Sequence, residues 1–208
     1  MLKSKGKPSL ASASPVPAKT ASADSGAPVE TSGCPIVGIG ASAGGLEAFS
    51  ELLSHLPVDT GMVFVLIQHL SPTHKSALPQ ILSKISRLPV EEVSHDVRVA
   101  PNRVYVIPPD RNLTFADETL KLTPRPATAA FYRSIDSFFE SLAETRRERS
   151  IGVILSGTAT DGTLGLEAIK AAGGITFAQD ASAKFDSMPR SAVAAGCVDL
   201  VLSPRKIA

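Results

Sequence analysis

The sequence predicts an α/β protein built on a doubly wound, mostly parallel, Rossmann-like sheet with helices on both faces and a β-hairpin insertion. Short apolar runs alternate with amphipathic segments along most of the 208 residues, which is typical of βα units. A glycine-rich turn at residues 38–45 follows the first apolar run. Three β-rich runs between residues 103 and 122 are joined by turn residues, which indicates the hairpin.

The first half of the chain supplies two βα units and then the hairpin. Pro79 falls early enough in the second helix to be tolerated in its first turns. The predicted elements are a strand at 35–39, a helix from the glycine-rich turn through Leu53, a strand at 62–67, a helix at about 76–86, and β-rich runs at 103–107, 112–115 and 119–122.

The second half returns to βα alternation. Its clearest helix begins at Ser134, a predicted N-cap. One apolar stripe with helical spacing follows, formed by Ile135, Phe138, Phe139, Leu142 and Ala143. Further strands are predicted at 151–155, 175–178 and 198–202. A helix at 163–172 is predicted to end at two glycines, and a helix at 189–196 to begin with Pro189 at N1. A last helix is predicted to begin at Ser203-Pro204.

The chain divides into a tail and one domain. Residues 1–33 contain no aromatic residue and are dominated by Ser, Ala, Pro and Lys, so they cannot bury enough apolar area to offset the entropy of ordering. We expect this tail to be disordered. Residues 34–208 are long enough for one domain with its own core. The last predicted helix is cut off at Ala208, as expected of a fragment of a longer protein.

Composition narrows the classes of function. The formal net charge is +1, from 21 basic and 20 acidic side chains, so nucleic acid is not an expected partner. Apolar runs of about six residues fall far short of the roughly 20 that a membrane span requires, so no membrane insertion is expected. Cys34 and Cys197 lie far apart and lack metal-ligand spacing, which favours a cytoplasmic protein without a metal site. No cofactor is predicted.

Three predicted strands are followed by loops that each offer one group for nucleophilic catalysis. Ser42 follows the first strand, His69 the second, and Asp161 the strand at 151–155. Because the carboxyl ends of parallel strands meet at one edge of a sheet, these side chains are expected to converge. A serine needs a base to take its proton, and the base needs an acceptor that fixes its tautomer. We therefore predict Ser42 as nucleophile, His69 as base and Asp161 as the orienting carboxylate.

Small residues surround these three side chains. Glycines beside the serine allow a sharp turn and close approach of a substrate, and N–H groups at the start of the following helix suit an oxyanion. The predicted active-site loop residues are Gly40, Ala41, Ala43, Gly44 and Gly45 around the serine, and Gly157 and Gly162 around the aspartate.

Each of the three residues also has a structural interpretation. Ser42 is a preferred residue for a helix N-cap, His69 at a strand end suits a structural hydrogen bond, and Asp161 before a glycine is typical of a turn or cap. Their coincidence at one sheet edge favours catalysis. His74 lies close enough to His69 in the chain to remain a rival base.

Two familiar motifs match the glycine-rich turn. Gly38-x-Gly40-x-x-Ala43 satisfies a relaxed dinucleotide-binding pattern, but the second strand ends in Gln68-His69 where that pattern expects an acid. Residues 40–44 also satisfy the G-x-S-x-G nucleophile elbow, whose partners follow in the order Ser, Asp, His. Here the histidine precedes the aspartate, so neither motif is preferred.

Four ordered segments carry a resemblance to one enzyme family. They are residues 36–45, IVGIGASAGG; Gln68-His69; residues 155–162, LSGTATDG; and residues 178–190, from Ala-Gln-Asp to Met-Pro-Arg. Over residues 35–204 the chain resembles the CheB-type protein-glutamate methylesterases, which remove methyl groups from chemoreceptor glutamates. Residues 68–72 and 104–109 look most like the branch fused ahead of a CheR-type methyltransferase.

The resemblance implies a serine esterase mechanism. A receptor methyl ester would be attacked by Ser42 to give an acyl-enzyme and methanol, and water would then release the glutamate; some relatives also deamidate receptor glutamine. His69 would act as general base and then acid, and Asp161 would orient it. The family's oxyanion donors match the backbone N–H groups of His69 and Thr158.

The sequence departs from the family at two places. Chemotaxis members usually have Gly-Met-Gly where this chain has Gly157-Thr158-Ala159, and Ala43 stands where they often have threonine. A backbone oxyanion hole is compatible with both changes, but the shape of the pocket is not carried over. Met188 and Arg190 are further expected pocket residues.

The implied partners are methyl-accepting chemotaxis receptors, with a CheR-type methyltransferase or a histidine kinase as further partners. The family's phosphorylatable receiver domain has no counterpart in residues 1–33. The leading hypothesis is a protein-glutamate methylesterase. The alternative is a non-catalytic regulatory or interaction module of the same chemosensory system.

Overall fold

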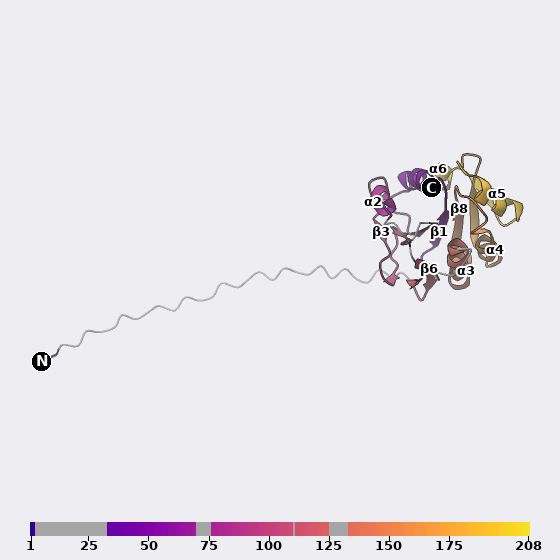
Figure 1. Ribbon diagram of the computed structural model, residues 1–208. Helices are drawn as coiled ribbons and strands as arrows, with labels where there is room; N and C mark the ends of the chain where they lie inside the picture. The colour runs from indigo at the N-terminus through magenta and orange to yellow at the C-terminus, as the bar shows by residue number, and fades with distance from the viewer. Residues whose placement is uncertain (3–32, 70–75, 110, 125–132) are drawn as a thin grey trace.

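A seven-stranded parallel sheet forms the centre of the molecule (Figure 1). The computed structural model describes residues 1–2, 33–69, 76–109, 111–124 and 133–208. Every strand pairing in this sheet is parallel, in the order β10-β9-β8-β1-β2-β5-β3. The strands are β1 Ile36–Ala41, β2 Val63–Gln68, β3 Val90–Glu92, β5 Arg103–Val106, β8 Ser150–Ile154, β9 Ile175–Gln179 and β10 Leu200–Leu202.

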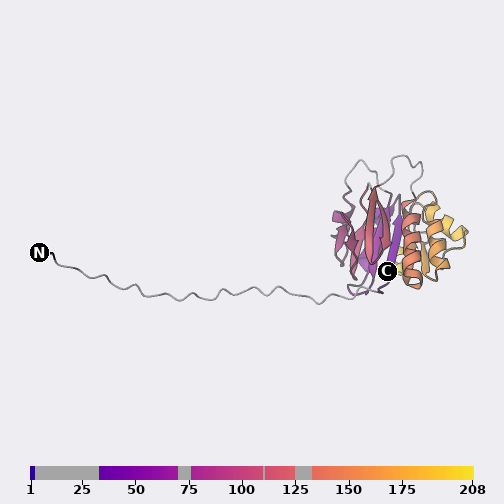
Figure 2. The ribbon, with the colours of Figure 1, turned by 90° about the horizontal axis from the view of Figure 1, so that it is seen from below.

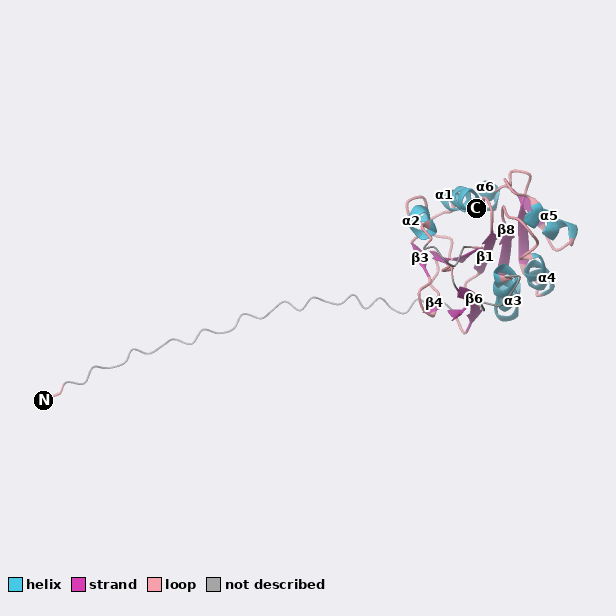
Figure 3. Cartoon of the chain, in the orientation of Figure 1, coloured by secondary structure: helices cyan, strands magenta, loops and turns pink. Residues whose placement is uncertain are grey.

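Helices cover both faces of this sheet, as Figure 3 shows. One face carries α1 Gly45–His55, α2 Leu78–Leu82 and α6 Pro204–Ile207. The other face carries α3 Ser134–Arg146, α4 Thr163–Ala171 and α5 Ser187–Ala194. A 3-10 turn, η1 Arg147–Arg149, follows α3. Figure 2 shows α3 and α4 side by side. The predicted doubly wound α/β fold is confirmed. No helix in the described ranges is long and apolar enough to cross a bilayer.

The strands read as continuous apolar runs because both of their faces are buried. Along β2, Val63, Val65 and Ile67 enter the core on the α3 side, whereas Phe64 and Leu66 enter the core on the α1 side. The apolar stripe predicted on α3 faces the first of these cores. Two hydrophobic layers therefore hold the sheet rigidly between its helices.

The predicted hairpin is confirmed, and it belongs to a separate sheet. Strands β6 Arg111–Ala116 and β7 Thr119–Pro124 are antiparallel and pair with β4 Val97–Arg98 in the order β4-β7-β6. The run at 103–107, which the sequence grouped with these strands, instead forms β5 and pairs in parallel with β2. The hairpin packs on α3, where Ser141 Oγ accepts the N–H of Phe115 at 3.0 Å.

Some predicted boundaries were wrong. α2 spans only 78–82, and α5 begins at Ser187, so that Pro189 is its third residue and still lies in the first turn, where no N–H is needed. Ser134 is the first residue of α3 rather than its N-cap, and no side chain of the flanking residue caps the helix. The expected disorder of residues 3–32 lies outside the described residues.

The strand order reverses at β1. From β1 the chain moves through β2 toward β5 and β3, and later returns to the other side of β1 with β8, β9 and β10. In parallel sheets, a reversal of this kind leaves a crevice at the carboxyl ends of the central strands, where ligands usually bind. The predicted site residues Ser42, His69 and Asp161 follow β1, β2 and β8, the strands on either side of this reversal.

Candidate active site

The three predicted catalytic residues leave neighbouring strands at the same edge of the sheet. Ser42 follows β1, His69 follows β2, and Asp161 lies in the loop after β8. The parallel register pairs Ala41 with Gln68, so Ser42 and His69 leave the sheet at the same level. The fold thus places residues far apart in sequence around the point where the strand order reverses.

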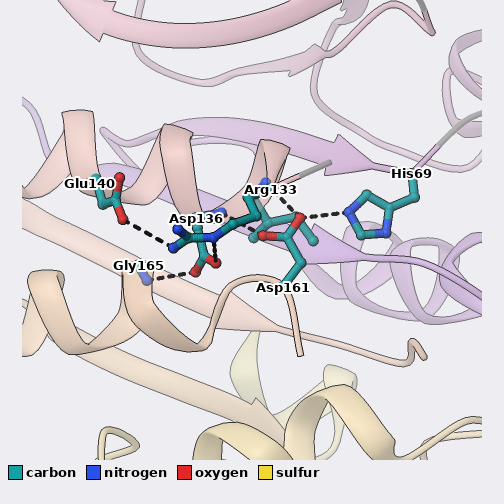
Figure 4. Close-up of polar contacts among 7 residues, drawn as sticks. His69, Arg133, Asp136, Glu140, Asp161 and Gly165 are labelled. Carbon is teal, nitrogen blue, oxygen red and sulfur yellow. Dashed lines mark hydrogen bonds and ion pairs between the residues drawn. The ribbon is translucent and has the colours of Figure 1, made fainter. Parts of the chain in front are cut away.

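The histidine and the aspartate form a direct pair. His69 Nε2 lies 2.6 Å from Asp161 Oδ2 (Figure 4). An ionised carboxylate can only accept, so Nε2 carries the hydrogen and Nδ1 is left as the nitrogen that can take a proton. This is the tautomer that a general base requires.

The start of α3 holds Asp161 in place. The backbone N–H of Ile135 donates to Asp161 Oδ2 at 3.1 Å, and that of Asp136 donates to Oδ1 at 3.0 Å. These are donors that a helix leaves unpaired in its first turn. Asp161 therefore caps α3 from another part of the chain, which is why Ser134 is not needed as the cap.

These contacts keep Asp161 ionised. Burial alone would raise the pKa of its carboxyl, but the hydrogen bonds from His69 and from the N–H groups of Asp136 and Ile135 outweigh burial and hold the pKa below the ordinary 3.8. A charged carboxylate at this position stabilises an imidazolium on His69. The electrostatics therefore suit proton transfer to the ring.

Ser42 is held by its backbone and not by its hydroxyl. Its N–H donates to Ser156 O at 3.0 Å, and its carbonyl accepts the N–H of Gly45 at 2.9 Å. In the described part of the chain, Ser42 Oγ makes no hydrogen bond, to His69 or to any other group. The N-cap of α1 is Gly44, so the interpretation of Ser42 as a helix cap is wrong. The backbone of the predicted nucleophile is therefore held in place, while its hydroxyl stays available.

Gly44 and Ser156 shape the turn around the serine. Gly44 has a φ of 74°, and a Cβ there would fall 2.5 Å from Ser156 Oγ. Ser156 Oγ donates to Ala43 O at 2.8 Å and accepts the N–H of Phe185 at 3.0 Å. The buried Ser156, which sequence reasoning did not single out, thus joins the turn around Ser42 to the loop between β9 and α5.

The loop from Gly157 to Gly162 follows β8 and contains Asp161. Ala159 adopts a left-handed backbone with a φ of 69°, a conformation that favours glycine. The exposed Thr158 has an N–H that donates no hydrogen bond within the described residues, whereas the N–H of His69 donates to Ala41 O at 3.4 Å. Of the two expected oxyanion donors, Thr158 is the one whose N–H is open.

A pocket of about 460 Å³ opens beside the pair. It is lined by His69, Arg133, Asp136, Ala159, Thr160, Asp161, Thr163 and Leu164. Sequence reasoning missed Arg133 and Asp136, although both immediately flank the predicted helix start at Ser134 and Ile135. Among the described residues, no group of three or more His, Cys, Asp or Glu side chains could hold a metal ion.

Neither of the two expected pocket residues lines the pocket beside the His69–Asp161 pair, and their expected role stays a prediction. Met188 is buried beneath Gly157, where an added Cβ would fall 2.0 Å from the Met188 sulfur. Arg190 is exposed, lies 3.6 Å from Asp186, and lines a different pocket with Gln179 and Asp180. The physical reason is that α5 packs its first turn under the loop after β8 and turns position 190 outward.

The fold, with the His69–Asp161 pair and Ser42 at the same edge of the sheet, defines the class as a doubly wound α/β domain with a candidate serine, histidine and aspartate set at its strand reversal. Residues 37–208 match the family described as CheB methylesterase. The chain belongs to this family. The more specific resemblance to the branch fused to a methyltransferase stays a prediction.

The names of known proteins similar to this chain each give the same two activities. A protein-glutamate methylesterase/protein-glutamine glutaminase of Photorhabdus laumondii is 36% identical over 177 residues, covering 83% of this chain and 50% of the relative. A putative one of Leptospira interrogans is 37% identical over 172 residues, covering 82% and 89%. The chain therefore spans about half the length of the first relative and most of the second.

A solved structure also supports the assignment of this chain to the CheB methylesterase family. The crystal structure of the Thermotoga maritima CheB methylesterase catalytic domain matches with a TM-score of 0.77 and 30% sequence identity. The match covers 84% of this chain and 95% of that one. The described residues therefore share the fold of that domain over nearly all of its length.

Proposed function

We propose that this protein hydrolyses glutamate methyl esters on chemoreceptors and that the same site deamidates receptor glutamine. The observation that carries the proposal is the 2.6 Å contact between His69 Nε2 and Asp161 Oδ2, anchored by α3 at the sheet edge where Ser42 emerges. The names of the similar proteins from Photorhabdus laumondii and Leptospira interrogans give both activities.

In the proposed reaction, Ser42 Oγ attacks the ester carbonyl carbon while His69 Nδ1 takes the hydroxyl proton. The tetrahedral intermediate collapses, the proton passes from His69 to the leaving methoxide, and methanol departs from an acyl-enzyme. Water then attacks the acyl carbon by the same proton route and releases glutamate and the free serine. With glutamine as substrate, ammonia leaves in place of methanol.

The negative oxygen of the intermediate needs donors already in place. The open N–H of Thr158 is the proposed principal donor, and the N–H of His69, engaged by Ala41 O at 3.4 Å, is the proposed second. Losing one such donor typically costs about 3 kcal/mol of transition-state stabilisation. Backbone donors do not depend on the side chains at 158 and 159, which fits the departures from the family there.

We further propose chemoreceptors as the partners, because they carry the glutamate methyl esters of the proposed reaction. We also propose the cytoplasm as the location, since the chain lacks metal-ligand and disulfide spacing. A CheR-type methyltransferase or a histidine kinase is a further proposed partner. This proposal rests on the resemblance of the sequence at residues 68–72 and 104–109 to the branch fused to a methyltransferase.

Methanol release from methylated receptor membranes tests the proposal. We expect release by the wild type, a fall of about 10⁴-fold or more in Ser42→Ala, and wild-type release by Ser54→Ala, a control serine on the exposed side of α1. Melting temperatures verify that all three proteins are folded. Equal, background release by folded wild type and Ser42→Ala would instead favour the non-catalytic regulatory module.

A further inference from the structure

The position of Asp161 depends on how two helices are placed. Asp161 lies just before α4, whereas the N–H groups that hold it belong to the first turn of α3. Any change in the distance between these two helix starts moves the carboxylate relative to its donors. Because His69 takes its orientation from Asp161, the imidazole would move as well.

The side chain of Asp136 spans the same gap (Figure 4). Its Oδ1 accepts the N–H of Gly165, the third residue of α4, at 2.7 Å, while its own backbone N–H donates to Asp161 at 3.0 Å. Its Oδ2 accepts Arg133 Nε at 3.0 Å. Asp136 is only 3% exposed, so both of its carboxylate oxygens are satisfied away from bulk water.

Gly165 makes this close contact sterically feasible. A Cβ at Gly165 would fall 2.5 Å from the Cβ of Phe139 and 3.1 Å from the Cα of Asp136. Only a residue without a side chain lets α3 and α4 approach to this distance. The two helix starts are therefore joined by backbone contact and by one carboxylate.

We propose that Asp136 is a positioning residue for the reaction: by joining the starts of α3 and α4 it holds Asp161 on its two backbone donors and thereby fixes the ring of His69. The proposal rests on the proposed function for its activity readout. A purely structural role would lower stability without altering the site of the folded protein. A misplacement of about 1 Å in a catalytic site can cost about 100-fold in rate, so the two roles are separable.

Three variants separate these roles. Asp136→Ala removes both side-chain contacts. Asp136→Asn keeps Oδ1 as an acceptor for Gly165 but presents an amide donor to Arg133. Glu140→Gln is the matched control, since Glu140 lies on the same helix, 3.5 Å from Arg133 Nη2, and contacts neither Asp161 nor Gly165.

Two measurements on the folded proteins test the proposal: the rate at which a fluorophosphonate labels Ser42, and the downfield proton resonance of the His69 ring N–H bound to Asp161. In Asp136→Ala we expect labelling about 10- to 100-fold slower and loss of the resonance. Asp136→Asn should be intermediate, and Glu140→Gln should stay within about twofold of wild type. Wild-type labelling and an unchanged resonance in both Asp136 variants would overturn the proposal.

The proton resonance also separates this proposal from the proposed function. If the wild type does not react with the probe, hydrolysis by Ser42 fails, and the resonance alone decides the role of Asp136. Its loss in Asp136→Ala with retention in Glu140→Gln supports positioning, and its retention in both overturns it. If Asp136→Ala does not fold, Asp136→Asn replaces it in each comparison.

Discussion

The two halves of the candidate site are held in opposite ways. On the side of β8, Asp161 accepts hydrogen bonds from His69, Ile135 and Asp136 and is almost completely buried. On the side of β1, Ser42 is half-buried, its backbone is bonded at both ends, and its hydroxyl makes no hydrogen bond within the described residues.

This difference shows how stability and reactivity are divided between the halves. The carboxylate is part of the fold, because it satisfies the first turn of a core helix as well as the imidazole. The serine hydroxyl contributes nothing to the fold that the structure records, so it is available to a substrate. Mutations in the two halves should therefore separate into those that lower activity alone and those that also lower stability.

His69→Ala should give the largest effect, and mainly on activity. The ring transfers the proton in both steps of the proposed reaction, so its removal should slow fluorophosphonate labelling of Ser42 by about 10⁴-fold or more. Stability should fall much less than activity, because the side chain is 24% exposed and Asp161 loses one donor but keeps both of its backbone donors. Near-wild-type labelling by the folded variant would remove His69 from the mechanism.

Asp161→Asn should lower both properties. We expect a loss of activity of about 10³- to 10⁴-fold, since the amide favours the wrong tautomer of His69. Urea unfolding should also show about 1 kcal/mol less stability, because α3 loses a charged acceptor at its start. Asp186→Asn is the control, since Asp186 flanks α5 but makes no side-chain cap bond. Equal stabilities of the Asp161 and Asp186 variants would contradict the dual role.

Acid should remove the stability difference between wild type and Asp161→Asn. The pKa of Asp161 is lower in the folded chain than its ordinary 3.8, so its charge stabilises the fold above that value. This contribution is lost as pH falls through the still lower folded pKa. Urea midpoints of the two proteins should differ at neutral pH and converge only below about pH 4. Convergence already at about pH 6 would show that another group is responsible.

Ala159→Gly should give the smallest effect and should raise stability. Alanine at a φ of 69° carries a left-handed strain of about 1–2 kcal/mol, from which the extra unfolded-state entropy of glycine, about 0.4–1 kcal/mol, is subtracted. A net gain of about 0.5–1 kcal/mol in urea unfolding is expected. Ala181→Gly, at a residue without positive φ, should lose stability and serves as the control.

Local patterns predicted the parts of the fold that depend on local chemistry. The apolar stripe of α3, the glycines that end α4 and the turn between β6 and β7 could all be found from neighbouring residues. The placement of Ser42, His69 and Asp161 at one edge of the sheet followed from the rule that parallel strands end at one edge. The short strands β3 and β4 were missed, since runs of three and two partly exposed residues carry no usable period.

The remaining errors involve partners far apart in the chain. Ser134 is a good N-cap by composition, but the donors of α3 are satisfied by Asp161, which lies beyond the next strand. No local window contains both partners. Asp136 was invisible for the same reason, because its bond to Gly165 depends on how closely α3 and α4 approach. Arg133 lines the pocket together with residues that are distant in the chain, so no local pattern indicated it either.

The central position of β1 bears on how activity returns during refolding. Pairing of β1 with β2 closes a short loop, whereas pairing of Gly40 with Ile154 requires most of the domain to have collapsed. Ser42 follows β1 and Asp161 follows β8, so this late pairing brings the two strands that carry them together. If the proposed mechanism holds, a partly assembled chain lacks esterase activity, and the recovery of turnover reports when β1 and β8 pair.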